Sequence, residues 1–181
     1  LMKKKIIFTT GGTGGHILPA INLMQHFKNK GYNVMLVTDK RGATFLKGYP
    51  EVRSHILKAD TPTNKNLFKK FLSLLTILHS IIKSANILNK EKPDLILGFG
   101  GYVSFPISFV SKFFKIPLII YENNLVLGRA NKFLLSIAKK VLLAKIIDNN
   151  LLKKYRNKTY LVGAILNKEI INYPEHLRFK N

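Results

Sequence analysis

Short apolar runs alternate along this chain with longer segments in which apolar residues recur at helical spacing. The runs that predict strands are 5–10, 32–39, 93–101, 116–124, 141–144 and 159–164. The segments that predict helices are 16–30, 66–89, 103–114 and 128–140. Because the strands are nearly continuous in Val, Ile and Leu and helices separate them, the pattern predicts an α/β fold: a Rossmann-like, doubly wound parallel sheet covered on both faces.

The ends of the first helix carry local signals that support this assignment. Pro19 fits the first turn of a helix, where its missing N–H costs nothing, and Gly31 stands where a C-terminal glycine belongs. Residues 40–65 lack a clear period and are expected to be irregular. After Gly163 the pattern dissolves into a polar tail, so we expect one domain over residues 1–165 and a separate segment over 166–181.

The charge of the chain narrows the choice of partner. Lys and Arg number 30 against 9 acidic residues, a formal net charge of +21. Such a surface suits nucleic acid, a phosphorylated substrate or an anionic membrane, although the base composition of a genome can also produce lysine-rich chains. No helix-turn-helix, aromatic RNA-binding signature or basic motif is present, so no specific nucleic acid is expected.

Several other classes of protein are not expected from the composition. The chain has no cysteine, and its five histidines are scattered, so neither a disulfide nor a zinc site is expected. The apolar run near the N-terminus is too short for a signal peptide, and no uninterrupted apolar run approaches the roughly 18 residues of a membrane span. We expect a cytoplasmic protein that need not be free in solution.

The stretch GGTGGH at 11–16 follows the first predicted strand and opens the first predicted helix. Glycines let a ligand reach backbone N–H groups, and a helix N-terminus favours negative charge, so this loop is a candidate cradle for a diphosphate or sugar phosphate. His16 and Ile17 stand where a Walker loop needs Lys and Ser or Thr, and Ile17 also breaks the dinucleotide fingerprint. His16 is a candidate general base, or alternatively a cap or hydrogen-bonding orienter.

Two further strand ends carry polar groups. GFGGYVSFP at 98–106 repeats the sequence of strand, glycines and helix start, and there Tyr102 and Ser104 can hydrogen-bond a ligand. YENN at 121–124 places the Glu122 carboxylate and two amides at a third strand end. The alternative for Glu122 is that it neutralises a neighbouring lysine. Ligands of doubly wound sheets lie beyond such carboxyl ends of strands.

Taken together, GGTGGHILPA, GFGGYVSFP and YENN…LGRANK resemble, in order and spacing, the N-terminal half of the MurG family. The resemblance covers about residues 3–166. It implies the N-terminal half of a GT-B glycosyltransferase, which transfers N-acetylglucosamine from UDP-GlcNAc to undecaprenyl-diphosphate-linked muramoyl-pentapeptide in peptidoglycan synthesis. It also implies inversion at the anomeric carbon, with no cofactor and no metal.

The resemblance assigns roles to residues of all three motifs. His16 would be the base on the acceptor hydroxyl, and Glu122 a second catalytic residue facing the cleft. The residues implied in substrate binding are Thr13, Gly14, Gly15, Gly100, Gly101, Tyr102, Ser104 and Asn124. Of these, residues 13–15 would approach the donor and the diphosphate, Tyr102 and Ser104 would line the acceptor side, and Asn124 would contact the donor sugar.

The resemblance also gives a meaning to the predicted helix 66–89. Its apolar positions are flanked by Lys65, Lys69, Lys70 and Lys83, as in segments that lie on an anionic membrane surface. The resemblance implies peripheral docking on the cytoplasmic face of the plasma membrane. The alternative is an ordinary helix packed on the sheet.

Two departures from the family pattern affect the expected activity. Tyr121 stands where the family has His, and after Gly163 the family pattern Gly-Asn-Pro-x-Arg is absent, with Lys168 one place beyond the arginine position. The chain is also only as long as the acceptor-binding half, so residues 166–181 would be a linker or the start of a donor-binding domain. Three interpretations remain: a half that needs a separate C-terminal donor-binding domain, an inactive remnant, or a stand-alone module that binds lipid diphosphates.

Overall fold

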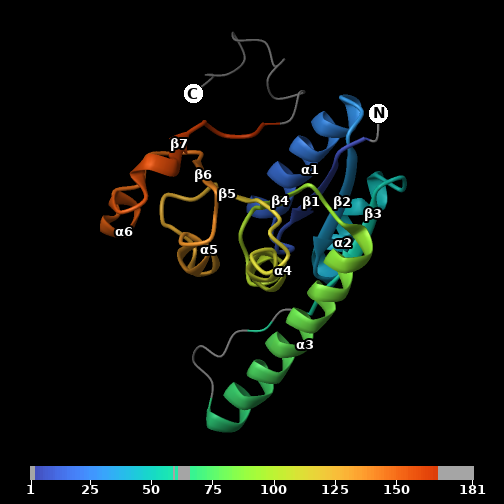
Figure 1. Cartoon of the computed structure of the whole chain (residues 1–181), viewed down its shortest axis with the longest axis horizontal. Helices are drawn as coiled ribbons and strands as arrows, with labels where there is room; N and C mark the ends of the chain where they lie inside the picture. Colours follow the sequence, from blue (N-terminus) through green and yellow to red (C-terminus); the bar gives the residue numbers. More distant parts are fainter. Residues whose placement is uncertain (1–2, 59, 61–65, 167–181) are drawn as a thin grey trace, which may run out of the picture.

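The computed structural model describes residues 3–58, 60 and 66–166, and all of its strands belong to one parallel sheet (Figure 1). The strand order is β3-β2-β1-β4-β5-β6-β7. The strands are β1 (Lys5–Thr9), β2 (Asn33–Thr38), β3 (Arg53–Ile56), β4 (Leu95–Gly98), β5 (Leu118–Glu122), β6 (Lys140–Leu143) and β7 (Thr159–Leu161). The predicted doubly wound, Rossmann-like α/β fold is therefore confirmed.

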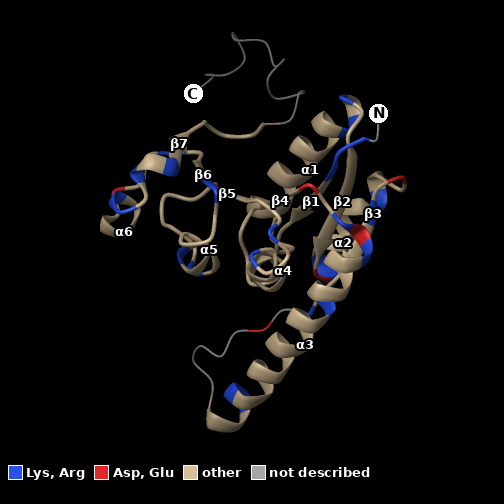
Figure 2. Cartoon of the chain, in the orientation of Figure 1, with Lys and Arg blue, Asp and Glu red and all other residues tan. Residues whose placement is uncertain are grey.

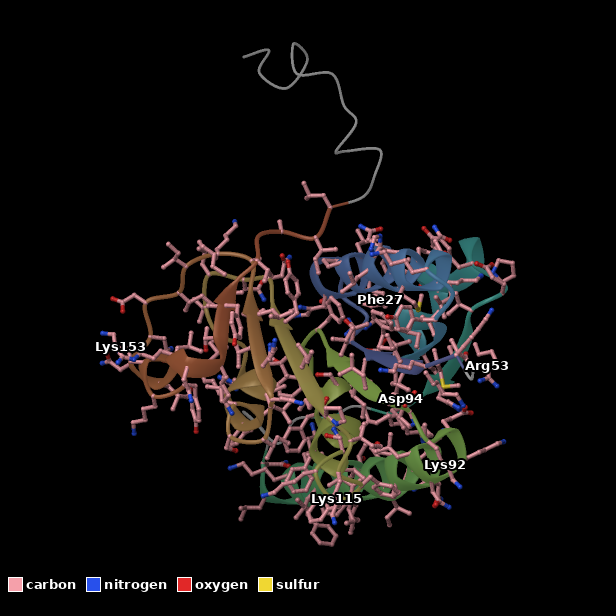
Figure 3. The ribbon with its side chains drawn as sticks, turned by 45° about the horizontal axis from the view of Figure 1, so that its top comes forward. Phe27, Arg53, Lys92, Asp94, Lys115 and Lys153 are labelled. Atoms are coloured by element: carbon pink, nitrogen blue, oxygen red, sulfur yellow. The ribbon has the colours of Figure 1, made fainter. Side chains whose placement is uncertain are left out.

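The order in which the chain adds strands to the sheet reverses at β1. From β1 the chain builds outward through β2 to β3, then returns to pair β4 with the other side of β1 and builds outward to β7. Ile7 of β1 consequently lies opposite Met35 on one side and Ile96 on the other. Arg53 of β3 and Lys153 near β7 lie at opposite ends of the molecule (Figure 3). The carboxyl ends of β1 and β4 form the switch point at which ligands of such sheets bind.

Helices cover both faces of this sheet. The helices are α1 (Gly14–Asn29), α2 (Lys40–Thr44), α3 (Leu67–Glu91), α4 (Ser104–Val110), α5 (Arg129–Leu134) and α6 (Asn150–Lys153), with short 3₁₀ turns at Phe45–Gly48 and Arg156–Lys158. α1 packs its apolar face on one side of the sheet, and α3, α4 and α5 lie on the other (Figure 1). Each face therefore has its own buried apolar cluster, as continuous apolar strands require.

Several predicted boundaries were wrong, each for a local reason. α1 begins at Gly14 rather than 16, because Thr13 is extended and both following glycines adopt helical backbone. The region 40–65 contains α2 and the strand β3, whose sequence RSHI is largely exposed because it forms the edge of the sheet. The helices predicted at 103–114 and 128–140 end as α-helix at Val110 and Leu134, and turns follow them. Gly31 has the positive φ of +86° that ends α1.

α3 differs from the other helices in its length and exposure. Asn66 caps its start, with a side chain that accepts a hydrogen bond from the Lys69 N–H, and Lys92 follows its end in left-handed backbone. Its last turns pack against α4, whereas its first turns extend beyond the sheet (Figure 1). By length and composition alone α3 could cross a membrane, although 28% of its apolar window is buried in the protein. Lys65, which was predicted to flank this helix, lies outside the described residues, as do 167–181 with Lys168.

Candidate functional site

The first two glycine loops meet by backbone contact at the switch point. The Gly11 N–H donates to the Gly100 carbonyl at 3.0 Å. Gly101 has φ of +80°, and a Cβ added there would lie 2.8 Å from the Gly11 Cα atom. Only glycine fits such a contact, since real Cβ atoms do not approach backbone so closely. These glycines therefore join two loops that lie about 90 residues apart in the sequence.

The neighbouring glycines divide into structural and open positions. A Cβ on Gly12 would collide with the Asp39 carboxylate and the Gly42 N–H, and that carboxylate accepts hydrogen bonds from both amides at 3.3 and 2.7 Å. In contrast, nothing lies within 4 Å of a Cβ added to Gly14 or Gly15. The first turn of α1 thus presents bare backbone at Gly14 and Gly15, whose N–H groups have no intrahelical partner and where the helix dipole is positive, whereas the His16 N–H donates to the Thr13 carbonyl at 2.9 Å.

Two cavities adjoin this turn. The larger, of about 1020 Å³, extends from Gly11–Thr13 along the ends of β2 and β3 to α3. Four basic residues line it, namely Lys40, Arg41, Lys58 and Lys83, together with Asp39 and Asp60. The smaller, of about 250 Å³, lies between the second glycine loop and the loop after β5. His16 and Tyr102 line both cavities, so the imidazole stands where the two spaces adjoin.

His16 is the third residue of α1, and its ring lies beside Gly100. A Cβ added to Gly100 would be in ordinary contact with both side chains, 3.4 Å from the His16 Cε1 atom and 3.5 Å from the Asn131 Nδ2 atom, so what favours glycine there is its φ of +87°. The His16 Nδ1 atom is buried and has no hydrogen-bond partner among the described residues. The Asn131 Oδ1 atom is likewise buried and without a hydrogen-bond partner among the described residues. Two unpaired polar atoms therefore lie in side chains that line the smaller cavity.

Glu122 organises the loop that follows β5. Its side chain is 1% exposed. One oxygen accepts hydrogen bonds from the Asn124 N–H at 3.0 Å and its Nδ2 at 2.9 Å, and the other from the Gly128 N–H at 2.8 Å and the Asn131 Nδ2 at 3.0 Å. The predicted lysine partner is not among these four donors, which are all amides. The carboxylate borders the smaller cavity and holds Asn131 at its wall.

The remaining predicted site residues have different environments. Tyr102 is 42% exposed at the mouth of both cavities. Ser104 is buried and lines neither cavity. Its hydroxyl donates a hydrogen bond to the Gly101 carbonyl at 2.8 Å and fixes that loop. Asn124 is exposed and its amide is bonded to Glu122. The structure brings together the three predicted loops, but Ser104 and Glu122 stabilise loops through their hydrogen bonds.

Sequence reasoning missed Asn131 and the basic lining of the larger cavity. Asn131 belongs to the quoted segment GRANK, and its place in that motif was the available signal, whereas its burial appears only in the structure. Lys40, Arg41 and Lys58 follow strands β2 and β3, and the missed strand β3 concealed that their side chains border one space. Among the described residues, no group of three or more His, Cys, Asp or Glu is placed to hold a metal ion.

Comparison with known proteins identifies relatives of the whole described domain. Residues 6–143 match the glycosyltransferase family 28 N-terminal domain. The chain is 38% identical over 169 residues to the UDP-N-acetylglucosamine–N-acetylmuramyl-(pentapeptide) pyrophosphoryl-undecaprenol N-acetylglucosamine transferase of Rickettsia canadensis, covering 93% of this chain and 46% of that protein. The protein of the same name from Pelagibacter ubique is 35% identical, over 94% of this chain and 47% of its own length. The chain thus spans about half the length of these curated relatives.

Solved structures share the fold. The Acinetobacter baumannii MurG crystal structure superposes with a TM-score of 0.75 at 23% identity, covering 91% of this chain and 47% of that chain. The Staphylococcus aureus MnaA–UDP structure gives a TM-score of 0.67 at 16% identity, over 90% of this chain and 44% of that chain. At these identities the likeness establishes the parallel-sheet architecture.

Proposed function

Because the chain belongs to the glycosyltransferase family 28 N-terminal domains and is MurG-like, we propose that it is the acceptor-binding half of an N-acetylglucosaminyltransferase. The donor is UDP-GlcNAc and the acceptor is undecaprenyl-diphosphate-linked muramoyl-pentapeptide, so the product belongs to peptidoglycan synthesis. The position of His16 carries this proposal: an imidazole in the first turn of α1, at the common wall of two cavities.

The proposed reaction needs a base for a hydroxyl nucleophile. The His16 imidazole accepts the proton of the acceptor hydroxyl while the oxygen bonds to the anomeric carbon of GlcNAc. The bond from that carbon to the UDP oxygen breaks, and UDP leaves with the bonding electrons, which inverts the anomeric centre. The bare first turn of α1 at Thr13, Gly14 and Gly15 stabilises phosphate charge through its N–H groups and dipole.

The other site residues would act mainly on the acceptor and on the shape of the loops. Tyr102, with Gly100 and Gly101, forms the acceptor side between the two cavities. Glu122 acts by fixing the loop that follows β5, and Asn124 contacts the donor sugar from that loop. The lysines of the larger cavity supply positive charge for the diphosphate of the acceptor.

We infer that α3 docks the protein on the cytoplasmic face of the plasma membrane. Its first turns expose the large apolar side chains of Leu67, Phe68, Phe71, Leu72, Leu74, Leu75 and Leu78. Lys69 and Lys70 are exposed on the same turns, and the larger cavity reaches Thr76 of this helix. An acceptor whose diphosphate lies in that cavity could thereby keep its polyprenyl chain in the membrane.

The test is transfer of labelled GlcNAc from UDP-GlcNAc to the lipid-linked muramoyl-pentapeptide. We expect no product from the chain alone and product when a MurG-type C-terminal donor-binding domain is added in trans. His16→Ala should reduce kcat by about 100-fold or more with little change in acceptor affinity, since a general base contributes that much. His26→Ala, in the last turn of the same helix, is the matched control and should retain activity.

Absence of product in every assay with folded protein would contradict the transferase proposal. Binding of the lipid-linked acceptor would then identify a stand-alone lipid-diphosphate module, and absence of binding an inactive remnant. Unchanged turnover in His16→Ala would remove His16 from the role of base.

A further inference from the structure

The first turn of α1 has a carbonyl that its own helix cannot satisfy. In an α-helix the Gly15 carbonyl would accept a hydrogen bond from the N–H of residue 19, but residue 19 is proline and has none. The Asn123 Nδ2 atom donates to this carbonyl instead, at 3.1 Å. The predicted first-turn place of Pro19 was wrong, because α1 begins at Gly14 and Pro19 lies inside the helix. Pro19 thus leaves free an acceptor beside His16, and Asn123, which follows β5, occupies it.

The same asparagine lies next to a buried phenol. Tyr121 is 3% exposed, and its ring packs against Phe99 with ring centroids 5.4 Å apart. Its hydroxyl lies 3.3 Å from the Asn123 Oδ1 atom and 3.2 Å from the Gly163 carbonyl, and its single proton serves one of them at a time. The hydroxyl oxygen accepts a hydrogen bond from the Ile165 N–H at 3.2 Å.

The segment held by this hydroxyl follows the last strand. The Val162 N–H still bonds to the Leu143 carbonyl at 2.9 Å, and then Gly163, with φ of +82°, turns the chain. The segment runs from β7 back toward α1 (Figure 1). There Ile165 packs against the apolar cluster that includes Tyr121. The segment is therefore fastened by one side-chain hydroxyl and by one apolar contact.

These bonds form a continuous chain with one direction. The Ile165 N–H donates to Tyr121, the Tyr121 O–H can donate to Asn123, and the Asn123 amide donates to the Gly15 carbonyl. Bonds aligned in this way polarise one another. We propose that Tyr121 and Asn123 are positioning residues that couple the segment 163–165 to the glycine turn carrying His16.

Movement of the segment therefore changes the turn. When the segment moves away, the Tyr121 hydroxyl loses the Ile165 N–H donor and also the Gly163 carbonyl that competes for its proton. That proton then serves the Asn123 Oδ1 atom alone. The Asn123 amide is then held in one orientation, with its Nδ2 atom on the Gly15 carbonyl, which tightens the turn beside His16. The effect on transfer rests on the proposed function, whereas the coupling itself is a property of this chain.

The coupling is testable by amide hydrogen exchange and ¹⁵N-resolved NMR on the 181-residue chain. Tyr121→Phe keeps the ring and removes the hydroxyl. We expect about fivefold or greater acceleration of Ile165 amide exchange, together with shifted Gly15 and His16 amide resonances. Tyr160→Phe, on β7 beside the segment, is the control and should change neither signal.

Asn123→Asp removes one hydrogen bond of this series, the one from Asn123 to the Gly15 carbonyl. An aspartate still accepts from the Tyr121 hydroxyl but cannot donate to the Gly15 carbonyl. We expect it to shift the Gly15 and His16 resonances while Ile165 stays protected. If Tyr121→Phe changes only Ile165 and leaves Gly15 and His16 as in the wild type, the coupling is refuted. Far-UV circular dichroism verifies that each variant is folded.

An activity measurement separates this inference from the proposed function. With the donor-binding domain in trans, Tyr121→Phe should lower kcat severalfold with unchanged KM for UDP-GlcNAc, and Tyr160→Phe should not. If the wild type gives no transfer, the proposed function fails, and the exchange data still decide whether the coupling exists. If transfer occurs and Tyr121→Phe equals the wild type in both exchange and kcat, the coupling fails alone.

Discussion

Glu91, the last residue of α3, is an acid surrounded by basic groups at the amino end of the sheet. It is 6% exposed and lies 3.0 Å from the Lys5 amine, 3.3 Å from the Arg53 guanidinium and 3.5 Å from the His55 ring. Burial raises the pKa of Glu91, but the hydrogen bonds from Lys5 and His55 and the charges of Lys5 and Arg53 outweigh it, so its net pKa is lowered. The carboxylate joins β1, β3 and α3, far from the glycine loops.

This environment predicts a pH-dependent contribution to stability. A lowered folded-state pKa gives stability that is present above the ordinary pKa of about 4.3 and is lost as pH falls through the lower folded value. Glu91→Gln should therefore lower the free energy of unfolding by about 2 kcal/mol at neutral pH, and by much less at strongly acidic pH. Urea denaturation of both proteins across that pH range measures the difference.

The matched control for Glu91 is Glu51→Gln. Glu51 pairs with Lys28 at 2.8 Å but is half exposed, so solvent screens the pair. Its removal should leave the free energy of unfolding almost unchanged at every pH. A loss at Glu91 that is equally large in acid and at neutrality would show that shape, rather than charge, explains its effect.

The glycines of the first two loops predict unequal tolerance of a methyl group. Gly101→Ala forces a Cβ against the backbone of Gly11 and a side chain into positive φ, so we expect a loss of about 2 kcal/mol or more in unfolding free energy. Gly14→Ala adds a methyl group in open space within a helix and should keep or slightly raise stability. Thermal unfolding of the two variants compares them directly, and equal melting temperatures would contradict the observed contact.

At the scale of elements, α3 differs from a core helix because it turns polar residues toward the protein and apolar residues toward the outside. Toward the protein it buries serines: Ser73, Ser80 and Ser84 are all buried, and the Ser80 hydroxyl donates to the Lys58 carbonyl at 2.7 Å. Its leucines and phenylalanines face outward over the first turns. The packed-helix interpretation describes the last turns, which pack on α4. Membrane docking stays a prediction for the first turns, whose apolar face is exposed.

This arrangement predicts which substitutions weaken membrane binding. Replacing Phe68 and Phe71 together by serine removes two exposed apolar side chains and should weaken binding to anionic vesicles about tenfold or more. Phe133→Ser, in an equally exposed phenylalanine of α5, is the control and should bind like the wild type. Vesicle co-sedimentation measures both. Equal binding of the double variant and the wild type would remove α3 from the docking surface.

Periodicity predicted the buried central strands, the exposed edge strand β7 and the helix α3, and it failed at β3, whose sequence RSHI has no apolar run. β1, β2, β4 and β5 appeared as apolar runs because both faces of each are covered. The helix predicted at 128–140 was too long because apolar residues continue past Leu134 into buried turns, whose spacing resembles that of a helix.

The candidate site was predictable as a set of loops but not as a set of contacts. The strand–glycine–helix pattern located the three motifs, because it reflects local backbone requirements. The contacts of Gly11 with Gly101 and of Asn123 with Gly15 depend on the order of strands in the sheet, which a single sequence does not contain. The role of Glu122 depends on four amide donors that converge only after its loop has folded.

At the scale of the whole molecule, the strand order brings these distant motifs together. β1, β4 and β5 are consecutive in space, so their carboxyl ends place the loops at 11–16, 98–104 and 122–131 along one edge. The first turns of α3 extend beyond the sheet (Figure 1), and the helix lines the larger cavity, which also borders the ends of β2 and β3. The catalytic candidates and the exposed apolar turns of α3 therefore border one continuous region of the molecule.

The net charge of +21 acts over this whole surface, since basic residues occur on nearly every element in Figure 2. Such a charge attracts any polyanion, whereas apolar contact with α3 is confined to one face. Raising salt to about 1 M shortens the Debye length to about 3 Å and suppresses the first interaction but not the second. We therefore expect binding to random-sequence DNA to disappear at high salt, while vesicle binding falls to a residual that requires Phe68 and Phe71. Loss of all vesicle binding at high salt would instead assign membrane attraction to charge alone, and α3 would then need another role.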